Sequence, residues 1–104
     1  MNKILIVTTT CPNIEDAQRI AKELVSDGYV ACAQVGNAIT STYIWKDKQY
    51  SENEIPLVLK TSINAIEKLE KKLKDLHPYE CPEFITIQAN ASAEYVKWVN
   101  DTCK

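Results

Sequence analysis

The spacing of apolar residues at the start of the chain predicts a strand followed by a helix. Residues 3–9 contain a continuous aliphatic run, which is typical of a strand at the centre of a sheet. Apolar residues then recur at helical spacing over residues 14–25. Asn13 can cap the first turn of this helix, and Gly28 can adopt the left-handed conformation that closes it. The chain therefore opens with a β-α unit.

A long β-hairpin is predicted for residues 29–61. Its first half is rich in β-branched and aromatic residues and pauses only at Gly36-Asn37, which we interpret as a bulge or bend within one strand. After a polar tip at residues 46–48, apolar residues alternate with polar ones at period two. Pro56 cannot donate to a ladder, so its nitrogen should face solvent or a bulge. Both strands exceed the usual length of about five or six residues.

The remaining pattern completes an α+β fold with an antiparallel sheet. Ser62 can cap a second helix that ends before His77-Pro78, because a residue that precedes proline avoids helical angles. A fourth strand at residues 84–87 precedes a short C-terminal helix introduced by Ser92. The order β-α-β-β-α-β is ferredoxin-like, with both helices on one face of the sheet and an extra helix at the end. Residues 1–104 are expected to form one domain with one core.

Composition and charge limit the kinds of partner that the chain is expected to bind. The chain has 104 residues and a net charge of -2, which gives no long-range attraction to nucleic acid or to an anionic membrane surface. The first apolar stretch is too short for a signal-peptide core or a membrane span. Four cysteines without a C-x-x-C pair are typical of reduced thiols. We therefore expect a cytoplasmic protein that binds neither nucleic acid nor membranes.

The predicted hairpin also indicates assembly. Two short helices cannot cover a ribbon of this length, so part of it should overhang the domain. The overhang would carry Tyr43, Ile44, Trp45 and Tyr50, exposing aromatic surface and a backbone edge unless another copy covers them. Homo-oligomerisation is the simplest remedy. The alternative is a ribbon that folds back on its own sheet.

Three segments carry a resemblance to a known family. Residues 43–48, the Leu59-Lys60-Thr61 segment and the run His77-Pro78-Tyr79-Glu80-Cys81-Pro82-Glu83 resemble the CutA divalent-cation tolerance proteins. The resemblance covers nearly the whole chain. It implies a homotrimer of ferredoxin-like subunits, similar in architecture to the PII signalling proteins, with a role in tolerance of divalent metals, chiefly copper.

The resemblance suggests His77, Glu83 and Cys11 as metal ligands. Some family members place a cysteine at the end of the first strand, where this chain has Thr9, and Cys11 follows two residues later. One histidine cannot satisfy a metal that takes about four ligands. We therefore expect copper or another divalent cation to bind weakly, with ligands shared between subunits. His77 can instead be a helix-terminal residue that contacts the last carbonyls.

A second group of residues is expected at a cleft between subunits. Glu52, Glu54 and Lys60 share one parity and project from one strand face, which fits a cleft or an ordinary solvated face. Trp45 could pack at a subunit contact or stack on a ligand, and Cys32 also fits a buried core position. The expected cleft residues are Trp45, Glu52, Glu54, Lys60, Tyr79 and Cys32.

No enzyme is expected. Cys11 precedes a helix whose dipole could lower its thiol pKa, but only His77 could serve as its base. The chain lacks the residues that are characteristic of an RNA-recognition module, a C-x-x-C metallochaperone or an acylphosphatase. Two hypotheses remain: a non-catalytic homotrimer that binds divalent metal in copper tolerance, and a PII-like trimeric module for a small anion or a partner protein.

Overall fold

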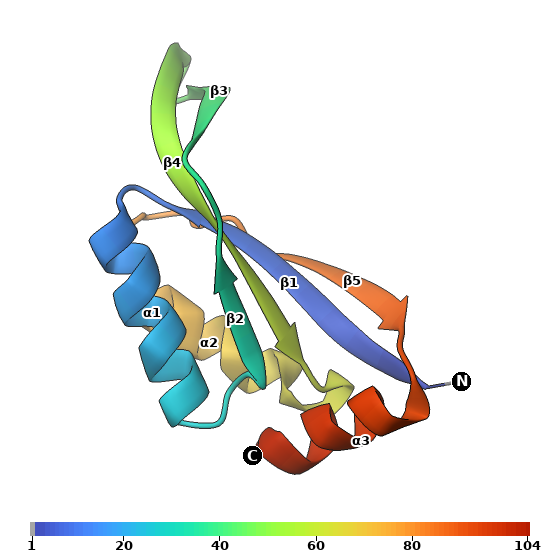
Figure 1. Ribbon diagram of the computed structural model, residues 1–104. Coiled ribbons are helices and arrows are strands. Elements are labelled where there is room, and N and C mark those ends of the chain that lie inside the picture. The colour runs from blue at the N-terminus through green and yellow to red at the C-terminus, as the bar shows by residue number, and fades with distance from the viewer. Residues whose placement is uncertain (1) are drawn as a thin grey trace.

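The computed structural model describes residues 2–104 and has the predicted order of elements (Figure 1). In chain order these are β1 (Lys3–Cys11), α1 (Ile14–Ser26), β2 (Cys32–Val35), β3 (Ile39–Trp45), β4 (Lys48–Thr61), a 3₁₀ turn (Ile63–Ala65), α2 (Ile66–Leu76), β5 (Ile85–Asn90) and α3 (Ala93–Thr102). The α+β fold predicted from the sequence is confirmed.

The sheet has the ferredoxin-like strand order β2-β4-β1-β5, and all its pairs are antiparallel. β1 lies between β4 and β5, as its continuous aliphatic run predicts. The helices α1 and α2 lie on one face of the sheet, and α3 lies at the end where β1 begins (Figure 1). β3 extends the sheet along the far half of β4.

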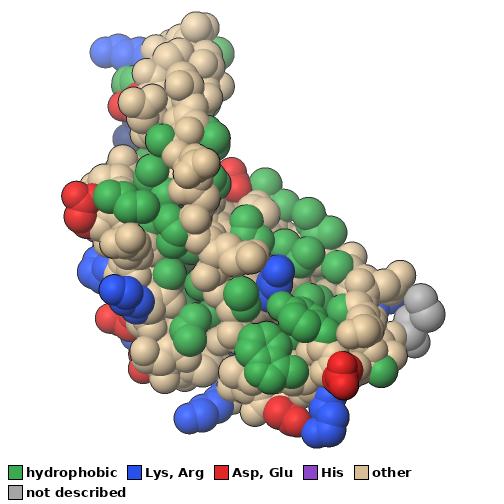
Figure 2. All heavy atoms as spheres, in the orientation of Figure 1, with side chains coloured by type: hydrophobic (Ala, Val, Ile, Leu, Met, Phe, Trp, Pro, Cys, Tyr) green, Lys and Arg blue, Asp and Glu red, His purple; other side chains and the backbone are tan. Residues whose placement is uncertain are grey.

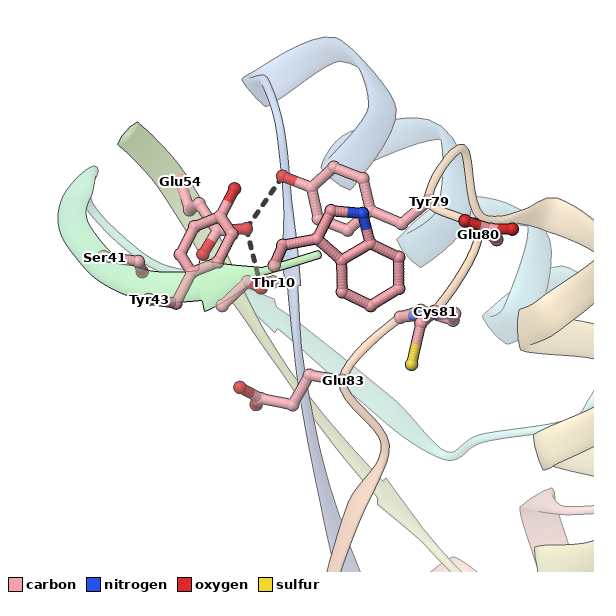
Figure 3. Close-up of a pocket in the computed structure, with 10 residues that line it drawn as sticks. Thr10, Ser41, Tyr43, Glu54, Tyr79, Glu80, Cys81 and Glu83 are labelled. Carbon is pink, nitrogen blue, oxygen red and sulfur yellow. Dashed lines mark hydrogen bonds between the residues drawn. The ribbon is translucent and has the colours of Figure 1, made fainter. Parts of the chain in front are cut away.

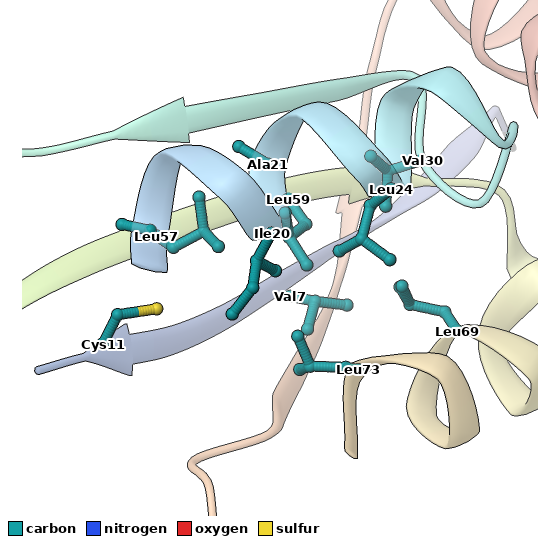
Figure 4. Close-up of a cluster of buried hydrophobic side chains, with 11 residues drawn as sticks. Val7, Cys11, Ile20, Ala21, Leu24, Val30, Leu57, Leu59, Leu69 and Leu73 are labelled. Atoms are coloured by element: carbon teal, nitrogen blue, oxygen red, sulfur yellow. The ribbon is translucent and has the colours of Figure 1, made fainter. Parts of the chain in front are cut away.

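The main core lies between the sheet and the helices α1 and α2 (Figure 4). Its largest fully buried side chains come from β1, β4, α1 and α2. They include Val7, Leu57, Leu59, Ile20, Leu24, Leu69 and Leu73, each 0% exposed. Burying one such side chain contributes about 1.5–3 kcal/mol. We call the sheet together with the helices packed on it the body. Its buried apolar side chains stabilise it.

The helix ends follow their sequence signals with one exception. The Asn13 side chain accepts a hydrogen bond from the Asp16 N–H at 2.8 Å, and Gly28 has a φ of 77° just beyond the last turn. Ser92 Oγ likewise accepts from the Tyr95 N–H at 3.2 Å. The prediction that Ser62 caps the second helix is wrong: its side chain makes no capping bond, because the chain enters α2 through a 3₁₀ turn.

The predicted bulge lies at residues 36–38. Val35 pairs with Leu57 and Ile39 with Glu54, so three residues of one strand face two residues of β4. The Gly36 N–H donates to the Pro56 carbonyl at 2.9 Å, and a Cβ on Gly36 would lie 2.8 Å from the proline ring. Glycine is required by this close approach. Pro56 thus faces the bulge, as expected for a residue without an N–H.

Beyond the bulge, β3 and residues 48–54 of β4 form a projection that we call the arm (Figure 1). Its two-residue turn places Lys46 and Asp47 at φ values of 50° and 67°, as a type I′ hairpin requires. The arm stretches the molecule to 44 × 25 × 24 Å. It does not fold back over the sheet, and its side chains are largely exposed, with Ile44 at 71%.

The face of the sheet opposite α1 and α2 is only partly covered. Ile6 and Ile87 are paired neighbours on this face, and Ile85 lies two residues along β5. Ile85 and Ile87 are 51% and 52% exposed, and Trp98 of α3 is 46% exposed. Figure 2 shows hydrophobic side chains gathered over this region. We call the surface of Ile6, Ile85, Ile87 and Trp98 the open face.

Candidate functional site

A cavity of about 460 Å³ lies where the arm meets the end of β1 and the loop after α2 (Figure 3). Three separate parts of the chain line it, so only the folded molecule assembles the site. The lining residues are Thr10, Ser41, Tyr43, Trp45, Glu54, Tyr79, Glu80, Cys81, Pro82 and Glu83.

Glu54 is the most buried carboxylate of the site, at 8% exposed. Thr10 and Tyr79 both donate hydroxyl hydrogen bonds to its Oε2, at 3.0 and 2.7 Å (Figure 3). Burial by itself would raise the pKa of Glu54, but hydrogen bonds from Ser41, Tyr79 and Thr10 outweigh it and hold the pKa below its ordinary value. Glu54 is therefore an ionised group at neutral pH.

Tyr79 owes its position to the end of α2. The helix stops at Leu76, and His77 takes an extended conformation before Pro78. The Tyr79 N–H then donates to His77 Nδ1 at 3.1 Å, which leaves the proton on Nε2 to bond the Thr10 carbonyl at 2.8 Å. Burial, followed by the bond to Glu54, raises the pKa of Tyr79. Tyr79 is thus a fixed hydroxyl donor at the cavity wall.

His77 and Cys11 lie together on the inner side of β1, behind Thr10. His77 is 7% exposed and Cys11 is 0% exposed, and Cys11 Sγ lies 3.9 Å from His77 Nε2. Burial and the nearby Asp16 carboxylate raise the pKa of Cys11 to about 11, against the opposing charge of Arg19. The helix dipole, which could have lowered this thiol pKa, is outweighed by desolvation. Cys11 is a protonated thiol at neutral pH.

The arm contributes the aromatic wall of the cavity. Tyr43 donates to the Glu52 carboxylate, and this bond raises the pKa of Tyr43 to about 12. Trp45 is 39% exposed, and Lys46 Nζ lies 5.6 Å from the centroid of its ring. Lys46 also forms an ion pair with Glu80 at 3.7 Å, so the tip of the arm contacts the loop after α2.

The structure brings some of the expected site residues together and separates others. Trp45, Glu54, Tyr79 and Glu83 line the cavity, and Glu52 reaches it only through Tyr43. Cys32 and Lys60 do not line it. They face each other across β2 and β4, and Lys60 Nζ lies 6.0 Å from the centroid of the Tyr95 ring.

The candidate metal ligands also fall into two places. Cys11 and His77 are buried behind Thr10, whereas Glu83 lines the cavity. Both ring nitrogens of His77 already have hydrogen-bond partners. Among residues 2–104, no three His, Cys, Asp or Glu side chains come close enough together to hold a metal ion.

Six lining residues were not singled out as site residues from the sequence. They are Thr10, Ser41, Tyr43, Glu80, Cys81 and Pro82. The signal for two of them was available, since Ser41 and Tyr43 share the parity of Trp45 and so project from the same face of β3. Glu80, Cys81 and Pro82 lie inside the segment 77–83 that carries the family resemblance. Thr10 has no sequence signal beyond being polar at the end of an apolar strand.

These features define a ferredoxin-like α+β domain with a projecting β-arm and an aromatic, carboxylate-lined cavity at the base of that arm. The model of the CutA1 divalent ion tolerance protein family matches residues 5–102, so the chain belongs to this family.

Individual relatives agree in sequence and structure. The divalent-cation tolerance protein CutA of Thermus thermophilus is 35% identical over 97 residues, which cover 92% of this chain and 94% of the relative. The crystal structure of CutA1 from Ehrlichia chaffeensis superposes with a TM-score of 0.90 at 37% identity, covering 98% of this chain and 96% of the other. A structure described as the periplasmic CutA of Archaeoglobus fulgidus has a TM-score of 0.90 at 26% identity, covering 98% and 99%.

Proposed function

We propose that this chain works in divalent-cation tolerance as a non-catalytic homotrimer. It binds copper or another divalent cation weakly, through ligands that more than one subunit supplies. The observation that carries this proposal is the pairing of an uncovered arm with an uncovered apolar face in one small domain. Family membership supports the role in cation tolerance.

Assembly follows from the surfaces that one chain leaves bare. Ile44 on the arm is 71% exposed, and Ile85 and Ile87 on the open face are more than half exposed. β3 also presents an edge with no neighbour on its outer side within the described chain. Further copies of the chain could pair with this edge and cover the open face. Assembly would then remove both the unpaired backbone edge and the exposed apolar surface.

Weak, shared metal binding is supported by the state of the candidate ligands. A metal on His77 would have to displace either the Tyr79 N–H or the bond to the Thr10 carbonyl. A metal on Cys11 would have to remove a proton from a buried thiol whose pKa is raised to about 11. Glu83 lies in the cavity and is free of these costs, but one carboxylate is a poor site without ligands from a neighbour.

The PII-like alternative divides into two cases. A small anion is disfavoured at this cavity, because three of its ten lining residues are Glu and none is Lys, Arg or His. A partner protein could still bind the open face if that face stayed bare in the assembled protein. The native mass of the assembly separates these possibilities.

We also place the protein in the cytoplasm. All four cysteines are free thiols, which suits a reducing compartment. The periplasmic description of one structural neighbour makes this a point to test, and cell fractionation tests it. Among residues 2–104, no helix has both the length and the apolar character needed to cross a membrane.

Native mass spectrometry of the metal-free and copper-loaded protein tests the proposal. We expect a mass three times that of the 11.8 kDa chain, without stoichiometric copper at low copper concentration. The variant Ile87→Asp, which places a charge on the open face, should shift the population toward monomer. Glu94→Gln changes an exposed residue of α3 and serves as its control. A compact wild-type monomer at high dilution would overturn the trimer. Tight binding of one copper per chain that survives His77→Ala would overturn weak, shared metal binding.

A further inference from the structure

The charge of the cavity is unbalanced. Its lining contains the carboxylates of Glu54, Glu80 and Glu83 and no basic side chain. Glu80 has a partner at the rim in Lys46, with both side chains more than 70% exposed. None of the ion pairs found within residues 2–104 involves Glu54 or Glu83. The inner part of the cavity therefore has negative charge without a counter-charge from its own chain.

Glu54 is the centre of this imbalance. It is 92% buried, and its hydrogen bonds come from the neutral hydroxyl groups of Thr10 and Tyr79. A carboxylate has about four acceptor positions, and the hydrogen bonds from Thr10 and Tyr79 both fall on Oε2. A buried carboxylate gains most from a partner that brings both hydrogen bonds and positive charge.

The aromatic residues beside Glu54 suit the same partner. Tyr43, Trp45 and Tyr79 line the cavity, and cations bind favourably over aromatic rings. The chain itself provides an example at the rim. The Lys46 ammonium lies 5.6 Å from the centroid of the Trp45 ring and 3.7 Å from the Glu80 carboxylate. One alkylammonium group thus already combines an aromatic face with a carboxylate of this cavity.

We propose that the cavity is a binding site for a small organic cation that bears a primary ammonium group. The ammonium donates to Glu54, and the alkyl part lies against the aromatic wall. A second ammonium, where the ligand has one, bonds Glu83. A cavity of about 460 Å³ is within the usual range for small-molecule sites. Glu83 is the residue that this site shares with the expected metal ligands. Among residues 2–104, Glu54 and the aromatic residues do not belong to a group of side chains that could hold a metal ion.

Fluorescence of Trp45 provides a direct measurement. The chain has two tryptophans, so the variant Trp98→Phe leaves Trp45 as the only one. Titration with 1,4-diaminobutane at constant ionic strength should give a saturable change in its emission. Butane-1,4-diol has the same chain without the charge and should give none. Equal responses to the diamine and to matching sodium chloride would show general screening only, and would overturn the proposal.

Two matched substitutions locate the site. Glu54→Gln keeps the shape and one acceptor oxygen but removes the charge, and should weaken diamine binding at least about tenfold. Glu67→Gln makes the same chemical change on the exposed side of α2 and should leave binding unchanged. Unchanged binding in Glu54→Gln would overturn the assignment. If Glu54→Gln fails to fold by circular dichroism, Glu83→Gln replaces it, with loss of the preference for the diamine over a monoamine as the expected result and an unaltered preference as the contrary one.

The result of the diamine titration is independent of the proposed function. Native mass and copper titration of the same preparation report trimer formation and metal binding without reference to the cavity. A trimer that binds no diamine would overturn this inference alone, and a monomer that binds the diamine would overturn the trimer alone.

Discussion

The body and the arm are built on the same strand, yet they differ in how they are stabilised. In the body half of β4, Leu57 and Leu59 are 0% exposed beneath α1 and α2. In the arm half, residues 48–53 are exposed or only partly buried, and on the paired strand β3 Ile44 is 71% exposed. Strand pairing is similar in both halves. Burial beneath the helices is therefore what distinguishes the body half of β4 from the arm half.

The arm does have local interactions. Tyr43 stacks on Tyr50 with ring centroids 5.6 Å apart, and Thr42 bonds Ser51 across the strands at 2.9 Å. Cross-strand pairs of this kind contribute roughly 0.2–1 kcal/mol each. A two-stranded ribbon with a few such pairs is marginal by itself. The comparison therefore teaches that strand pairing and a few cross-strand side-chain pairs stabilise the arm within the described chain, without a helix packed against it.

The largest expected effect separates the two regions by truncating one apolar residue in each. Leu59 pairs with β1 and β2 and is fully buried, so Leu59→Ala should destabilise the folded chain by about 2–5 kcal/mol. Ile44→Ala should change the stability of the folded subunit by less than about 0.5 kcal/mol, because the Ile44 side chain is 71% exposed. Denaturant unfolding measures the first effect, and native mass reports whether Ile44→Ala weakens assembly. Equal losses of subunit stability would refute the division into body and arm.

An intermediate effect comes from three threonines that differ only in their surroundings. Thr61 is fully buried and donates to the Tyr29 carbonyl at 2.8 Å, so Thr61→Val should cost about 1–2 kcal/mol. Thr42 bonds Ser51 in solvent on the arm, and Thr42→Val should be neutral within about 0.5 kcal/mol. Thr9 is fully buried, and its hydroxyl has no hydrogen-bond partner within residues 2–104. Thr9→Val should therefore stabilise the body by about 1 kcal/mol.

Thermal or denaturant unfolding of the three variants checks this order. The sharpest contrast is between Thr9 and Thr61, because both are buried and the substitution is the same. Destabilisation by Thr9→Val as large as that by Thr61→Val would mean that the Thr9 hydroxyl has a favourable role in the folded protein.

The smallest expected effect concerns pH at the junction of body and arm. Burial holds the pKa of His77 below its ordinary value of 6.5, against the raising effects of the Thr10 carbonyl, Asp16 and Glu54. The unfolded chain then takes up this proton before the folded chain does. Stability from His77 is complete above pH 6.5 and is lost as the pH falls from there through the folded-state pKa. Glu54, whose pKa is below its ordinary 4.5, adds a second loss below pH 4.5.

Unfolding free energies measured between pH 8 and pH 4 test this dependence. His77→Gln should remove the loss that begins near pH 6.5 and leave the one below pH 4.5. A wild-type stability that rose as the pH fell from 7 to 5 would contradict the burial of a neutral His77.

The sequence predicts the body better than the site. The aliphatic run of β1, the cap at Asn13 and the turn at residues 46–48 are local signals, and each acts within a few residues. The Ser62 signal failed because a 3₁₀ turn competes with side-chain capping at the same place. The parity of β4 predicts the direction of Glu54, but it does not predict that Glu54 is buried.

The site depends on contacts between residues far apart in sequence. Tyr79 is 25 residues from Glu54, and His77 is 66 residues from Cys11. A polar side chain becomes buried when a segment distant in sequence packs against it. The period of a strand or helix does not predict which segment this will be. The family resemblance suggested His77 and Cys11 as ligands, and only the fold reveals that the two side chains lie against each other and that His77 bonds the Thr10 carbonyl.

The bulge at residues 36–38, with its single extra residue, bends the hairpin. With the Gly36 contact to Pro56, it determines the direction in which the outer half of the hairpin leaves the sheet. A deletion there would leave the pairing of Trp45 with Lys48 intact, since the turn determines it, but would straighten the ribbon and aim it elsewhere. The direction of the arm, and with it whatever surface the arm can reach, can therefore change through chain length at one point, with every side chain of the arm unchanged.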